Sequence, residues 1–171
     1  MELWISKSDI LSHRYLGASV DTSEMLDQSI REAMLFDIQP ILGQPLFYDV
    51  VKKFDANETD YDDLLNGAVY EYRKEDIYFQ GVKKALVYYA FARYIKRDGV
   101  KFTVAGAVHK VDDFSDPVTD KTRQRLASDD YANAEALKLE IIQFLNTEID
   151  DYPLWNCATK KRKVTFRAIG D

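Results

Sequence analysis

Few side chains in this sequence are of types that do chemistry, and none stands at a spacing that a reaction needs. The two histidines, His13 and His109, lie far apart and have no cysteine or histidine at metal-ligand spacing, which favours surface or capping roles over metal binding. Cys157 is the single cysteine. A nucleophilic thiol needs a histidine base beside it, so an inert, partly buried thiol is the simpler interpretation. The sequence contains no phosphate-binding loop and no G-x-G-x-x-G, and we expect no cofactor and no catalytic residue.

Pairs of adjacent aspartates are the next candidates, at Asp62-Asp63, Asp112-Asp113, Asp129-Asp130 and Asp150-Asp151. Neighbouring side chains point in different directions on a helix and to opposite faces of a strand, so such a pair cannot share acid–base work. The spacing does not match an EF-hand either. We interpret these acids as solvated loop charges, with a divalent metal site as the alternative.

The sharpest cluster of charge is basic and consists of Lys160, Lys161, Arg162 and Lys163. Residues 160–171 carry five Lys/Arg and one Asp, whereas residues 1–159 carry 18 Lys/Arg and 28 Asp/Glu. The chain is therefore an acidic body of net charge −10 with a basic tail of +4. Three interpretations of the cluster stay open: it contacts nucleic-acid phosphate, it binds the acidic surface of a neighbouring subunit, or it is solvated.

The stretch from Phe79 to Arg97 is the element around which the rest of the chain is organised. Residues 86–92 are all apolar or aromatic, so a helix here must be covered on most sides. It is too short and too charged at its ends to cross a bilayer, and the chain shows no signal peptide, so we expect a soluble protein made in a cytoplasm. At 171 residues one domain is the default. The predicted fold is a mainly α helical bundle around this central aromatic helix, with four core residues on it: Leu86, Tyr89, Phe91 and Tyr94.

Other helices should lie against the central one. Spacings of four between apolar residues predict a helix over about 22–38, ended by Pro40 and Gly43. A third helix is expected over residues 46–54 and a long one from Asp116-Pro117 to about Glu148, with a break or bend at Asp129-Asp130 as an option. Residues 68–72 could form a short strand. Residues 75–81 (EDIYFQG) resemble a potyviral protease cleavage site, but they run straight into the central helix and are treated as native sequence.

Two segments predict strands that need partners. Residues 100–104 alternate in polarity and precede a small-residue turn, which indicates a β-hairpin at about 100–111 in a domain of residues 1–156. Residues 157–171 form a basic tail in which Val164, Phe166 and Ala168 alternate with polar or basic residues. A lone strand is not stable, so the tail should pair with a hairpin of its own or of a neighbouring chain. The predicted subunit or partner interface comprises Phe102, Val104, Lys160, Lys161, Arg162, Lys163, Val164 and Phe166.

The order of these features resembles the small helical head–tail connector, or neck adaptor, proteins of tailed bacteriophages, particularly those of crAss-like and other Bacteroidetes phages. The resemblance covers roughly residues 5–156 and rests on the order and the residue types of these stretches along the chain. The matching stretches are Ile41-Leu42-Gly43, Leu64-Leu65-Asn66-Gly67, the aromatic helix from Ala85 to Ile95, Thr103-Val104-Ala105-Gly106, Phe114-Ser115-Asp116, and Phe144-Leu145 to Tyr152-Pro153-Leu154-Trp155. The tail 157–171 lies outside it.

The resemblance implies a structural virion protein that forms a ring, usually twelvefold, docked beneath the portal. Its partners would be copies of itself, the portal protein and other neck or tail proteins, with DNA passing through the lumen and no membrane involved. No catalytic residues are carried over from this family. The alternative that the residues leave open is a helical nucleic-acid-binding protein using the basic tail; an enzyme is the least favoured class.

Overall fold

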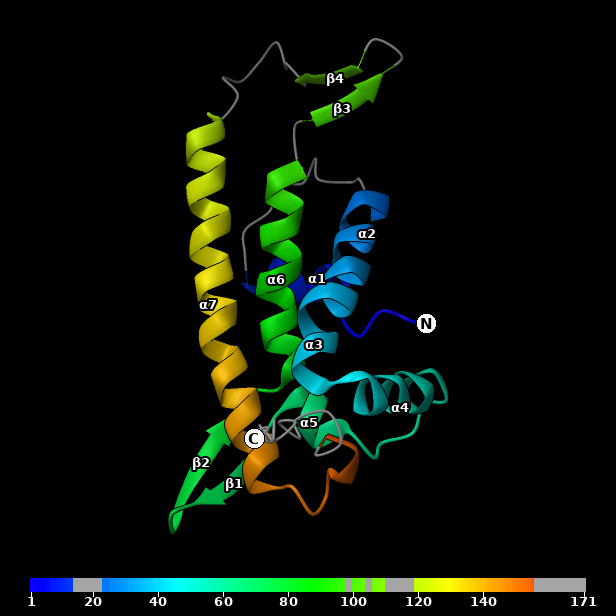
Figure 1. The fold of residues 1–171 in the computed structure, drawn as a ribbon. Coiled ribbons are helices and arrows are strands. Elements are labelled where there is room, and N and C mark those ends of the chain that lie inside the picture. The colour runs from blue at the N-terminus through cyan, green and yellow to red at the C-terminus, as the bar shows by residue number, and fades with distance from the viewer. Residues whose placement is uncertain (14–22, 98–99, 104–105, 110–118, 156–171) are drawn as a thin grey trace, which may run out of the picture.

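Figure 1 shows the computed structural model of the chain, which describes residues 1–13, 23–97, 100–103, 106–109 and 119–155. The elements follow in the order α1 (Lys7–His13), α2 (Ser23–Ala33), the π-helix η1 (Met34–Ile38), α3 (Gln39–Leu42), α4 (Gln44–Asp55), α5 (Asp62–Asn66), β1 (Ala68–Tyr72), β2 (Glu75–Phe79), α6 (Val82–Arg97), β3 (Val100–Thr103), β4 (Gly106–His109) and α7 (Asp120–Thr147). The fold is mainly helical with small antiparallel sheets, which confirms the predicted fold class.

Three long segments form the body, with α6 between α2 and α7 (Figure 1). The strand pair β3–β4 lies beyond one end of these helices, while α4, α5 and the pair β1–β2 gather at the other. None of the helices in the described part of the chain is long and apolar enough to cross a membrane.

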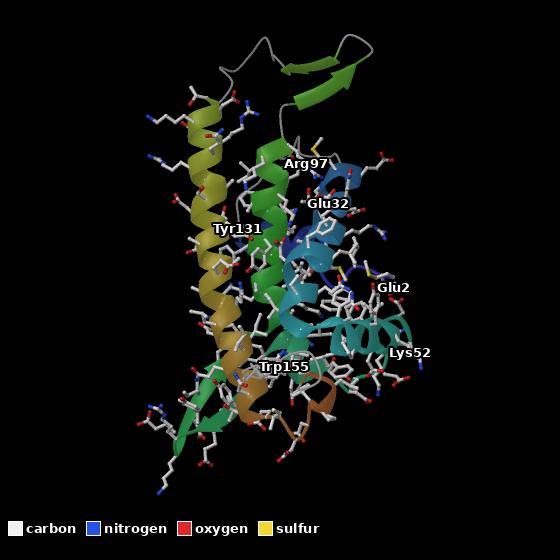
Figure 2. The ribbon with its side chains drawn as sticks, viewed as in Figure 1. Glu2, Glu32, Lys52, Arg97, Tyr131 and Trp155 are labelled. Carbon is white, nitrogen blue, oxygen red and sulfur yellow. The ribbon has the colours of Figure 1, made fainter. Side chains whose placement is uncertain are left out.

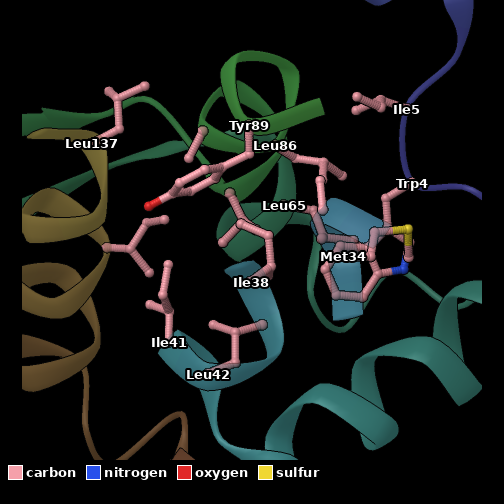
Figure 3. Packing of buried hydrophobic residues seen from close by; sticks show 14 of the residues in the cluster. Trp4, Ile5, Met34, Ile38, Ile41, Leu42, Leu65, Leu86, Tyr89 and Leu137 are labelled. Carbon is pink, nitrogen blue, oxygen red and sulfur yellow. The ribbon is translucent and has the colours of Figure 1, made fainter. Parts of the chain in front are cut away.

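The middle position of α6 follows from its sequence. Nine of its sixteen residues are buried, among them Leu86, Tyr89, Phe91 and Tyr94, the four predicted as core. Figure 3 shows side chains from α7, from η1 and α3, and from the N-terminal residues Trp4 and Ile5 packed around this helix. A helix that is apolar nearly all round must be enclosed in this way to remove its surface from water.

The central helix is shorter than predicted, because it begins at Val82 and not at Phe79. Residues 75–79 form β2, which pairs with β1 through the register Ala68↔Phe79 to Tyr72↔Glu75. The prediction of one short strand at 68–72 therefore missed its partner. Arg73 and Lys74 connect the strands with φ of 54° and 69°, the left-handed conformation that a two-residue hairpin turn requires.

Two glycines close the base of this hairpin. Gly67 precedes β1 with φ +100° and Gly81 follows β2 with φ +84°. A Cβ on Gly81 would come within 2.6 Å of the Leu65 carbonyl oxygen, and one on Gly67 would collide with the Phe79 carbonyl oxygen. Only glycine allows these two chain segments to cross so closely.

The second helix runs past Pro40, contrary to the prediction that it ends there. Residues 34–38 widen into a π-turn in which the Gln39 N–H donates to the Met34 carbonyl, and α3 then continues to Leu42 before Gly43. Proline cannot donate a backbone hydrogen bond and its ring crowds the preceding turn. The wider π-turn just before Pro40 accommodates both effects, so the helical path is kept.

The long helix α7 begins later than predicted, because Thr119, not Asp116, is its N-cap; the Thr119 side chain accepts from the Thr122 N–H. Residues 116–118 are outside the described residues. Asp129-Asp130 does not interrupt the helix, which is continuous to Thr147. Asp130 is 4% exposed and faces the body, so the pair is not simply solvated charge.

The second hairpin is formed by β3 and β4, which pair from Val100↔His109 to Thr103↔Gly106. The return strand thus covers residues 106–109, slightly earlier than expected. Phe102 lies in β3 opposite Ala107. Val104 falls outside the described residues.

Candidate interaction surface

The buried charges of the described chain connect helices to one another. Arg93 on α6 donates from Nε to Asp37 Oδ2 (2.6 Å) and from Nη2 to Asp37 Oδ1 (2.9 Å), so the carboxylate on the π-turn is held by a two-point contact. These hydrogen bonds raise the pKa of Arg93 above its ordinary value. The pair therefore fixes η1 against α6.

A second polar contact joins α6 to α7. The Tyr89 hydroxyl, which Figure 3 shows directed towards α7, donates to Glu135 Oε1 at 2.7 Å. Burial, followed by this hydrogen bond to an anion, raises the pKa of Tyr89, so the phenol stays protonated. Lys138 holds the other oxygen of Glu135 at 2.8 Å. Both effects keep the tyrosine as a donor rather than a base.

A third contact joins α2 to α6 at the end of α6 that leads to β3. Arg97 Nη2 lies 2.6 Å from Glu32 Oε2, and Figure 2 labels both residues. The hydrogen bond from Arg97 lowers the pKa of Glu32. Together the three contacts hold α2, η1, α6 and α7 against one another, because in each of them a polar group bonds to a group on a neighbouring helix. No group of three or more potential metal ligands occurs in the described residues.

The opposite end of the body has a groove along the outer edge of β1. The edge residues 68–71 form one wall of this β1-edge groove, and its other residues come from α5 and from the end of α7 and its following turn. Its volume is about 300 Å³. Three buried aromatic rings, those of Tyr70, Phe144 and Tyr152, form its floor.

The edge of β1 offers backbone hydrogen bonds. In the described part of the chain β1 has one neighbour, β2, and its other edge has none. In an antiparallel pair alternate residues bond to the partner, and here Tyr70 and Tyr72 occupy the bonded positions that a two-residue turn sets. The N–H and C=O groups of Val69 and Glu71 then point away from β2, into the groove.

Four carboxylates surround this edge: Asp63, Glu71, Glu148 and Asp151. None of them forms an ion pair within the described residues. The last turn of α7 carries no basic residue, so the negative end of its helix dipole adds to the same field. The groove therefore has a negative rim over a floor of buried aromatic rings.

The pKa of Tyr152, which lies in the groove, responds to these acids. Burial, followed by the nearby charges of Asp63, Asp151 and Glu148, raises the pKa of Tyr152 to about 12. The phenol packs against Phe144 and Tyr61, with ring centroids 5.6 and 6.1 Å apart. A neutral aromatic floor with acids around it suits a segment that alternates apolar and cationic side chains.

The structure places the predicted interface residues unevenly. Phe102 lies in β3, whereas Val104, Lys160, Lys161, Arg162, Lys163, Val164 and Phe166 lie outside the described residues. Phe102, the predicted interface residue that the structure describes, does not line the β1-edge groove. Sequence reasoning missed the groove because it began the central helix at Phe79 and assigned no strand to residues 75–79, so β1 had no predicted partner.

Fold and surface together define a mainly α protein with an acidic groove beside the edge of β1 that β2 leaves free. A family model described as a family of unknown function (DUF6712) matches residues 38–165, about three quarters of the chain. The chain belongs to this family, and the match includes Lys160–Lys163. No curated protein and no solved structure matches.

Proposed function

We propose that this protein is a structural subunit that assembles with copies of itself into a ring, the head–tail connector of a tailed bacteriophage virion, rather than an enzyme. The observation that carries the proposal is the β1-edge groove, a strand edge surrounded by four carboxylates that form no ion pair among the described residues, on a chain with a basic segment at residues 160–167. Identical subunits with two different complementary surfaces associate head to tail, and such contacts form a ring when the rotation between neighbouring subunits closes.

The polar interior supports a structural role. Within the described residues the buried polar side chains are Ser29, Asp37 and Asp130. Ser29 donates to the carbonyl of Met25 and Asp37 is held by Arg93, so both serve the helical layer. A catalytic site needs polar groups that converge on a cavity and are left free for a substrate. The contacts between α2, α6 and α7 instead give each subunit the rigidity that an assembled ring requires.

The place of the ring follows from the resemblance to connector proteins. It docks below the portal, joins the capsid to further neck or tail proteins and lets DNA pass through its lumen. The acidic body favours passage over binding, because carboxylates repel the phosphate backbone.

The proposal is tested by measuring the mass of the full chain by light scattering and imaging it by electron microscopy, alone and with a candidate portal protein. The expected result is a closed ring, formed alone or on the portal. A chain that stays monomeric at every concentration and binds neither portal nor neck proteins would overturn the proposal.

The same preparation tests the nucleic-acid alternative. Duplex DNA binding is measured at low salt for the native protein and for a variant with Lys160, Lys161, Arg162 and Lys163 all changed to Ala. The connector proposal predicts no appreciable affinity for either protein. Tight, salt-dependent binding that the variant loses would favour a nucleic-acid-binding function instead.

A further inference from the structure

The β1-edge groove sets three requirements on whatever fills it. The occupant must present backbone N–H and C=O groups to Val69 and Glu71, which only an extended segment does. It must place apolar side chains over Tyr70, Phe144 and Tyr152, and it must carry cations to meet the rim. Since successive residues of a strand face opposite sides, the occupant should alternate in character.

The tail of this chain has that pattern. Val164, Phe166 and Ala168 share one side of an extended segment, and Lys163, Thr165 and Arg167 share the other. Lys160, Lys161 and Arg162 precede it and add three further charges. Docked along β1, the first set would cover the aromatic floor and the second would lie on the same face as Glu71, with the preceding bases beside Glu148 and Asp151.

Resting on the proposed function, we propose that the β1-edge groove binds the basic tail of a neighbouring copy, whose residues 163–168 add to β1 as a third strand. Each subunit then supplies one groove and one tail, so every groove of a closed ring is filled. The pairing also covers a strand edge that would otherwise be a template for unspecific association.

The course of the chain favours a neighbour over the chain's own tail. Asp151 and Tyr152 line the groove themselves, and the chain then leaves through the turn at residues 153–155. The Trp155 Nε1–H donates to the Ile41 carbonyl at 3.1 Å, which anchors the exit on α3. In Figure 1 this turn, drawn in orange, lies on the other side of the α7 C-terminal end from the β1–β2 hairpin. The described chain therefore turns away from the β1–β2 hairpin before the tail begins, which favours a groove filled by a neighbouring copy.

Disulfide trapping between two full-length proteins tests the contact. Both carry Cys157→Ser, which removes the single native thiol. One carries Val69→Cys, an exposed position on β1, and an affinity tag that changes its size; the other carries Thr165→Cys. After mixing and mild oxidation, the mixed disulfide is measured on a non-reducing gel. The matched control replaces Val69→Cys by Ala132→Cys, an exposed position on α7.

The proposal predicts a mixed disulfide that forms at least about tenfold faster than the control, because docking raises the local concentration of the two thiols. A single chain with both Val69→Cys and Thr165→Cys should give a ladder of linked subunits. A compact, internally linked monomer would assign the groove to the chain's own tail and overturn the proposal. A mixed disulfide no faster than the control would overturn it as well.

Reversing charges in the tail and in the groove tests the tail contact separately from the assembly of the ring. Lys161→Glu with Arg162→Glu should slow mixed cross-linking about tenfold, and Glu148→Lys with Asp151→Lys in the groove protein should restore it. The matched control reverses Lys121 and Arg125, which are exposed on the first turns of α7. If light scattering still shows rings while trapping fails, the tail inference is wrong and the proposed function stands. If the native chain forms no oligomer alone and binds neither portal nor neck proteins, the proposed function fails first.

Discussion

The Arg93 guanidinium meets the Asp37 carboxylate through two hydrogen bonds of 2.6 and 2.9 Å. The two side chains differ in exposure, because that of Asp37 is 4% exposed and that of Arg93 is 26% exposed. The Asp37 carboxylate therefore has almost no access to water, whereas the Arg93 guanidinium keeps part of its contact with water. This asymmetry determines how each partner responds to loss of the other.

Removing the arginine should cost more stability than removing the acid. Arg93→Met leaves a buried carboxylate without its cation and is expected to lower the free energy of unfolding by about 3–5 kcal/mol. Asp37→Asn leaves a guanidinium that still reaches water, so we expect a loss of about 1–3 kcal/mol. Urea denaturation measures both, with Asp129→Asn, an exposed position on α7, as the control. Equal losses for the two variants would contradict this account of the pair.

The glycine crossing at the base of β1–β2 should not tolerate a side chain. Gly67→Ala and Gly81→Ala each combine a left-handed backbone with a collision against main-chain atoms, which cannot rotate away. Each is expected to lower the free energy of unfolding by about 2–4 kcal/mol. Gln80→Ala, an exposed change next to Gly81, is the control and should be nearly neutral. Thermal melts that leave all three variants alike would show that the crossing can relax.

Stability should fall in alkaline solution partly through Tyr152. Its pKa in the folded chain is about 12, above the ordinary value of 10.0, so the folded state binds the proton more tightly. The stabilisation is complete below about pH 10 and is lost as the pH rises towards about 12. Tyr152→Phe keeps the ring and removes the ionisable group. The difference in unfolding free energy between native and variant chains should therefore shift in favour of the variant over that range, and a constant difference would argue against the shift.

Two leucines on α7 test which face of the helix packs on the body. Leu137 is 9% exposed and Leu139 is 68% exposed, although only one residue separates them. Leu137→Ala should lower the free energy of unfolding by about 2–4 kcal/mol through the cavity it leaves. Leu139→Ala should change it by less than about 0.5 kcal/mol. Chemical denaturation of both variants gives the comparison, and a reversed order would mean that α7 is rotated about its axis.

Much of the helical framework was predictable, since local pattern and burial agree along it. The apolar run at residues 86–92 predicts an enclosed helix, and Leu86 and Tyr89 are in fact almost fully buried. The ends of the helices were predicted less accurately. Pro40 suggested a stop that a π-turn avoided, and Asp116-Pro117 suggested a start that Thr119 provides instead. These errors share one cause, namely that several residues nearby could cap or break the helix and the surrounding packing selects among them.

The sequence by itself determined the fold class, the identity of the central helix, the acidic body and the basic tail, because periodicity and charge are properties of the chain in order. Only the tertiary structure decided that residues 75–79 form a strand, that Arg93 holds Asp37, and that Asp63, Glu71, Glu148 and Asp151 surround one strand edge. The Arg93–Asp37 pair and the acids around the β1 edge join residues from tens of positions apart. Their positions depend on how α5, β1 and α7 pack, which local preference does not specify.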